Sequence, residues 1–241
     1  DSTPWVGTVG GVGSLEGDAW EHRSRYEYAP IAASYRAISH GDTRSLAADP
    51  DGGLWVGAGH TFSHYRDGRW TEHDPLRDVV DALVGPGGDG FAAQPLDLKI
   101  DADGTMWALT RVYANGRSAA ATMLVRRIGE EWSLYPFESV APDEGLESQH
   151  IAVHDGAVYL LVVESTRAKD QPPAQPRVLR FDGTATQELA HLPAGLGYRL
   201  ADVGPDGTVW IVGGSAERRR ADRIHIVPPE PSTAPARVVA G

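Results

Sequence analysis

Residues 96–110 read LDLKIDADGTMWALT, and this stretch decides the fold. It holds an alternating apolar run, an Asp-x-Asp-Gly turn signal, and a second apolar run that contains Trp107. Asp-Gly between two apolar runs is typical of a tight β-hairpin, because glycine accepts the positive φ that such turns need. The stretch therefore predicts two antiparallel strands joined by a short turn.

The same stretch recurs along the whole chain. An aromatic residue inside a short apolar run is found at Trp5, Trp55, Trp107, Tyr159 and Trp210, with spacings of 50, 52, 52 and 51 residues. The last four follow the turn signals DPDGG, DADGT, HDGA and GPDGT. Four turn signals in phase with the aromatic residues indicate an internal repeat.

Each repeat of about fifty residues contains signals for four short strands. An alternating run precedes each of the four turns, and a second hairpin follows the aromatic strand. Four antiparallel strands in a repeat of this length are the signature of a β-propeller blade. We therefore predict an all-β fold: a single five-bladed β-propeller of four-stranded antiparallel blades that occupies residues 1–241.

The ends of the chain bear on how the ring closes. The predicted repeat units are residues 1–30 with 236–241, 40–75, 90–137, 145–192 and 195–230. The first unit starts at its second strand, and residues 236–240 (ARVVA) form an apolar run without an obvious partner. We expect ARVVA to supply the missing inner strand and so to close the ring without an exposed edge. The alternative is that ARVVA is the outer strand of the last blade, within a larger ring.

Composition excludes several classes of partner. The chain has 22 basic and 33 acidic residues, a formal net charge of −11, and no cysteine, so it has no disulfide and no thiolate metal site. The acidic charge repels phosphates and argues against nucleic acid. No apolar run approaches the ~20 residues of a membrane span. We predict no nucleic-acid partner, no membrane insertion, and a monomer as an isolated domain.

The repeat resembles a known propeller family. Residues 89–110 (DGFAAQPLDLKIDADGTMWALT) resemble the two-component-regulator propeller repeat, and residues 144–162 and 194–213 share its frame. The turns are more distantly similar to those of streptogramin-lyase propellers. The first resemblance implies an extracytoplasmic ligand-sensing domain, often for carbohydrates, and the second implies an enzyme. The chain departs from the sensor type because it contains no kinase and only about five blades.

Blade geometry predicts where a ligand would bind. The loops between second and third strands share one face with the connections between blades, and long loops on a rigid scaffold commonly carry function. We predict that this face binds a small polar ligand, such as a carbohydrate, or a protein. The predicted contact residues are His60, Arg111, Tyr113, Arg117, Arg167 and Arg218. Arginine offers a planar fork of donors, and the tyrosine offers a stacking surface.

The sequence contains no recognisable catalytic motif. GxSxG, HExxH and P-loop patterns are absent. His60 with His64, and His150 with His154, have the spacing of a helical zinc pair, but four residues along a strand span roughly 13 Å. We therefore predict no catalytic residue, no metal and no cofactor, and we favour a binding module over an enzyme.

Two alternatives remain open at this point. One is a lyase or glycan-active hydrolase with an axial active site, which needs converging side chains such as His60, Asp42 and Glu164. The other is a protein-interaction scaffold without a small-molecule ligand, which a large exposed apolar patch would favour.

Overall fold

The structure is a computed structural model. It describes residues 4–8, 11–16, 18–24, 43–58, 61–79, 92–114, 118–141, 146–148, 150–164, 175–194, 197–215, 220–228 and 237–240. Apart from a helical turn at residues 77–79 and the one-turn helix α3 (Phe137–Val140), the regular structure of these residues is β-strand. All the strand pairs are antiparallel, as the Asp-Gly turns predict.

Five sheets follow one another in chain order. The first contains β1 (Trp5–Thr8), β2 (Gly11–Glu16) and β3 (Ala19–Ser24). The second contains β4 (Thr43–Ala48), β5 (Leu54–Ala58), β6 (Thr61–Arg66) and β7 (Arg69–His73). The third contains β8 (Ala92–Ile100), β9 (Met106–Ala114), β10 (Ser118–Ile128) and β11 (Glu131–Pro136). The all-β prediction and the number of sheets are confirmed.

The last two sheets continue the pattern. The fourth contains β13 (Ile151–His154), β14 (Ala157–Glu164), β15 (Arg177–Phe181) and β16 (Thr186–His191), and the short β12 (Leu146–Glu147) also pairs with β14. The fifth contains β17 (Gly197–Val203), β18 (Val209–Ser215), β19 (Arg220–Val227) and β20 (Arg237–Ala240).

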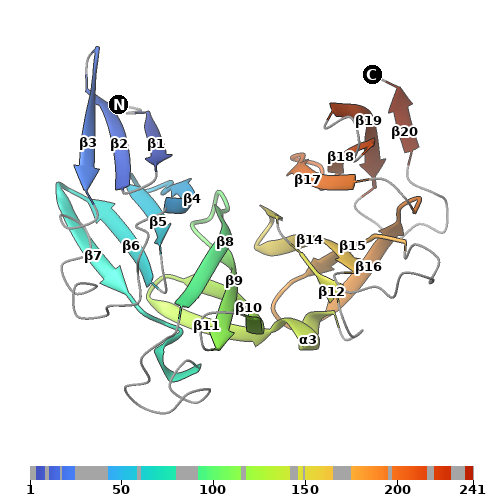
Figure 1. Cartoon of the computed structure of the whole chain (residues 1–241), viewed down its shortest axis with the longest axis horizontal. Helices are drawn as coiled ribbons and strands as arrows, with labels where there is room; N and C mark the ends of the chain where they lie inside the picture. Colours follow the sequence, from blue (N-terminus) through green and yellow to red (C-terminus); the bar gives the residue numbers. More distant parts are fainter. Residues whose placement is uncertain are drawn as a thin grey trace.

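The sheets are arranged as consecutive blades along an open arc. The first sheet lies at one end of the arc and the fifth at the other (Figure 1). Successive inner strands contact one another: β4 contacts β8, β8 contacts β13, and β13 contacts β17. The first sheet joins this series because β1 contacts β4.

The structure corrects the predicted ring closure. β20 pairs with β19, with Val239 opposite Ile224, and is therefore the outer strand of the fifth sheet. It does not pair with β1, and closure of the ring is not observed. The run ARVVA fits either partner by its apolar pattern, but pairing with the preceding strand closes a shorter loop and costs less chain entropy.

The turn between the first two strands has the same geometry in three of the sheets. Gly52, Gly104 and Gly207 have φ values of 91°, 83° and 79°. In each turn the glycine N–H donates to the carbonyl three residues earlier, at 2.9–3.0 Å. The repeated glycine is therefore required by the positive φ of this turn.

The repeated aromatic residues fill the contacts between sheets. Trp55 packs into a core with residues of the third sheet, and its ring centroid is 6.1 Å from that of Trp132. Trp107 does the same with the fourth sheet, where its centroid is 5.9 Å from that of Phe181. Tyr159 packs against the fifth sheet. Each of these three aromatic residues therefore joins its own sheet to the next one.

Close approach between the second and third sheets makes a prediction at Gly57. A Cβ atom added at this position of β5 would meet Ser45 Oγ and would lie 2.8 Å from Pro95 Cβ. We expect Gly57→Ala to lower the free energy of unfolding by about 1–3 kcal/mol, measured by urea denaturation, because the two packed sheets would have to move apart to make room for the methyl group. Gly197→Ala is the matched control, since its Cβ would lie 3.6 Å from Gly214 O, an ordinary contact. Equal effects of the two substitutions would contradict the prediction.

Candidate functional site

The predicted ligand-contact residues fall mostly outside the described part of the chain. His60, Arg117, Arg167 and Arg218 lie outside the described residues, as does Asp42 of the alternative enzyme site. For Tyr113 and Glu164 the structure describes the backbone, which lies in β9 and β14, but not the side chain. Whether these residues form one site stays a prediction.

Arg111 is described, and it lies in a different setting from the predicted one. It was expected in a long loop, but it lies within β9, opposite Gln94 of β8 and Thr122 of β10. This repeat has a spacing of 25 residues from Trp107 to Trp132, against 15 from Trp55 to Trp70, and the extra residues lengthen β9 and β10 to 9 and 11 residues instead of forming a loop up to residue 114. The alternating apolar residues Val112 and Ala114 continue the strand pattern, which explains the extension.

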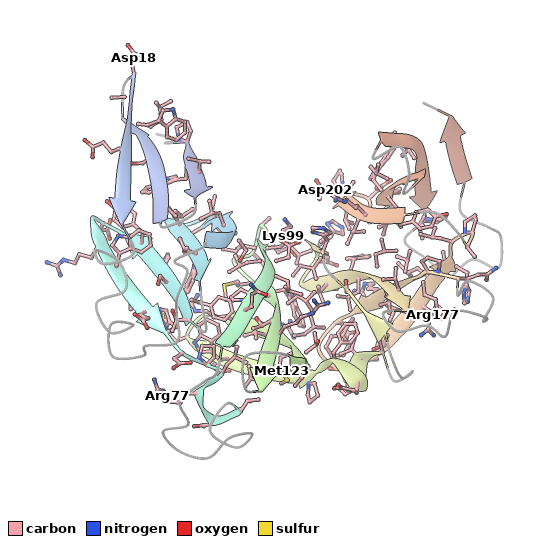
Figure 2. All side chains as sticks on the ribbon, in the orientation of Figure 1. Asp18, Arg77, Lys99, Met123, Arg177 and Asp202 are labelled. Atoms are coloured by element: carbon pink, nitrogen blue, oxygen red, sulfur yellow. The ribbon has the colours of Figure 1, made fainter. Side chains whose placement is uncertain are left out.

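A cluster of ionisable side chains lies on the inner strands of the arc. Asp97 of β8 accepts a hydrogen bond at its Oδ2 from the backbone N–H of Ile151, the first residue of β13, at 3.0 Å. Lys99 Nζ lies 3.2 Å from Asp97 Oδ1, and His150 Nδ1 lies 3.7 Å from Asp97 Oδ2. Lys99 lies on the inner side of the arc (Figure 2). We call Asp97, Lys99 and His150 the inner cluster.

The electrostatics of the inner cluster keep Asp97 ionised. Burial raises the pKa of Asp97, but the neighbouring His150 imidazole, the hydrogen bond from the Ile151 N–H and the Lys99 ammonium outweigh burial and hold this pKa below its ordinary value. The Asp97 side chain is only 13% exposed, whereas Lys99 and His150 are nearly half exposed. The carboxylate therefore pairs with Lys99 and lies beside His150, and both of these donor groups remain nearly half accessible. A lowered pKa suits an acceptor of hydrogen bonds and does not suit a general acid.

Sequence reasoning did not select the inner cluster. In the alternating run LDLKI the two charged residues are interpreted as ordinary polar positions of a strand. One sequence feature could have identified Lys99. Two residues before the turn aspartate, the second repeat has Ala47 and the third repeat has the charged Lys99. The sequence alone does not place His150 near Asp97 and Lys99, because they are brought together by the contact between β8 and β13, which are about fifty residues apart in sequence.

A second cluster of ionisable side chains packs between the second and third sheets. The His64 imidazole stacks on the indole of Trp55, with ring centroids 4.3 Å apart and planes at 6°. The Arg127 guanidinium lies 4.7 Å from the same indole, a favourable cation–π distance. Burial lowers the pKa of His64 although Asp49 Oδ2 lies 2.8 Å from its Nε2. These side chains are mostly enclosed and link β5 and β6 to β10.

Three further observations on the described residues concern other kinds of site. In that part of the chain no three His, Asp or Glu residues group closely enough to hold a metal ion. A carboxyl with a raised pKa occurs at Glu72, where burial and the neighbouring Asp74 disfavour ionisation. Glu72 lies on β7, the outer strand of its sheet, and not on an inner strand. Within the described ranges no helix has the length and apolar character to span a membrane.

Comparisons with known proteins support the fold alone. No family model and no curated protein matches the chain, so the two-component-regulator family is not shown. PorZ, a bacterial surface component of the type-IX secretion system of Porphyromonas gingivalis, is similar with a TM-score of 0.57 and 16% identity over 96% of this chain and 31% of PorZ. The Hadza microbial sialidase Hz136 is similar with a TM-score of 0.53 and 12% identity over 82% of this chain and 45% of the sialidase.

The chain thus spans less than half the length of either solved structure. At these identities the likeness carries no residue roles and no activity. The sheet order, the blade-to-blade contacts and the two similar structures agree on the architecture. The chain therefore has a β-propeller fold, shared with a bacterial surface component and with a sialidase.

Proposed function

We propose that the chain is a recognition module that binds a small hydroxyl-rich ligand with an anionic group, such as an acidic carbohydrate, at the inner cluster. The observation that carries this proposal is the position of two accessible donors, Lys99 and His150, beside a largely buried, ionised Asp97. Lysine supplies three donors and a positive charge, and imidazole supplies one or two more donors.

The rigidity of the scaffold supports the proposal. Asp97 is held by the backbone N–H of Ile151, so the carboxylate is fixed between two neighbouring blades. A fixed carboxylate orients Lys99 and His150 before a ligand arrives, which reduces the ordering cost of binding. An anionic group placed against these two donors would gain charge-assisted hydrogen bonds.

A purely structural role explains only part of the cluster. The bond from Ile151 to Asp97 ties β8 to β13 and needs no cation nearby. Lys99 is not required for this tie, and the second sheet has Ala47 at the equivalent position. The resemblance of the repeat to sensor propellers also supports a role in ligand sensing, as a domain of a larger bacterial protein.

The test is a thermal-shift comparison of acidic sugars with their neutral counterparts. Glucuronate, galacturonate and N-acetylneuraminate are compared with glucose and galactose. A ligand present at one hundred times its Kd stabilises by ~2.7 kcal/mol, which for a chain of this size raises Tm by roughly 5–10 °C. We expect such a shift with an acidic sugar and not with the neutral sugars.

Variants locate the site. Lys99→Ala and His150→Ala are expected to abolish the shift while keeping the unliganded Tm near that of the wild type, since both side chains are nearly half exposed. Arg69→Ala is the matched control, because Arg69 is an exposed cation on the outer strand β7. A shift that survives Lys99→Ala, or equal shifts with neutral sugars, would contradict the proposal. A flat screen would also contradict it and would favour a protein ligand.

A further inference from the structure

The four contacts between sheets follow one rule. The aromatic residue of the second strand points toward the following sheet, and Trp55, Trp107 and Tyr159 are at most 3% exposed. The residue after the aromatic points toward the preceding sheet and is fully buried in units two to five, at Val56, Ala108, Leu160 and Ile211. Each sheet therefore has a trailing face, which carries the aromatic residue, and a leading face that receives the preceding one.

At the two ends of the arc one such face has no neighbouring sheet: the trailing face of the fifth sheet and the leading face of the first sheet. On the trailing face of the fifth sheet, Trp210 is 41% exposed and Ile224 is 36% exposed. Ile226 pairs with Trp210, and Val212 pairs with Ile224, so the four side chains share one side of β18 and β19. This face is apolar, as are the covered trailing faces.

The leading face of the first sheet is uncovered in the same way. Val6 is the residue after the aromatic Trp5, yet it is 42% exposed, and Trp20 is 56% exposed. Both side chains lie over Gly13, since a Cβ there would be 3.2 Å from Val6 Cγ1 and 3.5 Å from Trp20 Cε3. The chain therefore exposes one half of a blade contact at each end.

The geometry of the arc keeps these two halves apart within one chain. They lie on sheets at opposite ends of the arc (Figure 1). The curvature is held by buried aromatic residues between sheets and by the bond from Trp107 Nε1 to Gly156 O, at 3.1 Å. Bringing the two end faces together would require repacking several of these contacts.

We propose that the uncovered trailing face of one copy packs on the uncovered leading face of a second copy, head to tail. The contact would repeat, between chains, the packing that joins each sheet to the next within the chain. The sequence-based prediction is a monomer as an isolated domain, whereas two complementary exposed apolar faces favour self-association. Because the two faces differ, the contact is heterologous, and it forms a closed ring or a growing chain of copies according to its rotation.

The first experiment measures mass against concentration by sedimentation velocity. We expect the weight-average mass of the wild-type chain to rise with concentration to roughly double the monomer value or more. Trp210→Lys and Val6→Lys should each keep the wild-type circular dichroism spectrum, because both positions are exposed, and each alone should remain monomeric. Ile128→Lys is the matched control: Ile128 is 50% exposed at the β10–β11 hairpin and lies on neither end face, so this variant should associate like the wild type.

Mixing the two interface variants tests the head-to-tail arrangement. Trp210→Lys keeps an intact leading face, and Val6→Lys keeps an intact trailing face. An equimolar mixture should therefore form a species of two chains that does not grow further. A wild-type chain that is monomeric at every concentration would overturn the proposal, whether the arc closes on itself or stays open. Association of Trp210→Lys alone, or no association in the mixture, would also overturn it.

Discussion

Trp107→Ala is expected to cost about 3–5 kcal/mol of unfolding free energy, the range for truncating a fully buried aromatic residue. The Trp107 indole is completely buried between the third and fourth sheets. It contacts Tyr135 and Phe181, with centroids 5.8 and 5.9 Å away, and Arg126 lies over its ring. Its Nε1–H donates to Gly156 O across the sheet boundary. Alanine would leave a cavity and an unpaired carbonyl at the same boundary.

Two further variants separate the parts of this effect, with urea denaturation at low protein concentration as the measurement. Trp107→Phe retains most of the ring and loses the N–H donor, so its cost should be intermediate. Trp20→Ala removes the same side chain from a position that is 56% exposed and should have the smallest effect. A cost for Trp107→Ala no greater than that for Trp20→Ala would show that the aromatic residue does not join the two sheets.

The architecture was predictable because its signals are local. A turn glycine and the strand aromatic lie within a few residues of each other, as in Gly104 and Trp107, and their repetition reveals the blades. Ring closure depends on which of two strands pairs with β20, and the short run ARVVA (residues 236–240) contains no information about that choice. The loop assigned around Arg111 was wrong because alternating apolar residues extend β9, and length alone does not separate a long loop from long strands.

The candidate site was much less predictable. The sequence predicts ligand contacts in loops, and most of the predicted contact residues lie outside the described part of the chain. The inner cluster depends on the contact between β8 and β13, which brings Asp97 beside Ile151 and His150. Such a contact is a property of the assembled blades and leaves no spacing signal in the sequence. The exposed end faces likewise become evident only when the same position can be compared among five sheets.

Asp97→Ala is expected to lower the free energy of unfolding at neutral pH by roughly 1.5–3 kcal/mol, the range for hydrogen bonds to a charged group. The half-exposed pair with Lys99 adds at most about 1 kcal/mol. The loss leaves the Ile151 N–H without its acceptor between β8 and β13. Asp97→Asn keeps an oxygen for that N–H and removes only the charge, so it should cost less than alanine.

The pH dependence of this difference distinguishes the charge of Asp97 from its packing. The pKa of Asp97 in the folded chain lies below its ordinary value, which in an unfolded chain is about 3.9. Unfolding therefore takes up a proton as the pH falls through this window, and the contribution of Asp97 is complete above the unfolded pKa and decreases below it. We expect the gap between wild type and Asp97→Ala, measured by urea denaturation, to be constant near neutrality and to narrow below about pH 4. Asp78→Ala, at an exposed aspartate, is the control and should show little gap near neutrality. A gap for Asp97→Ala that stays constant into acid would mean that Asp97 acts through its shape and not through its charge.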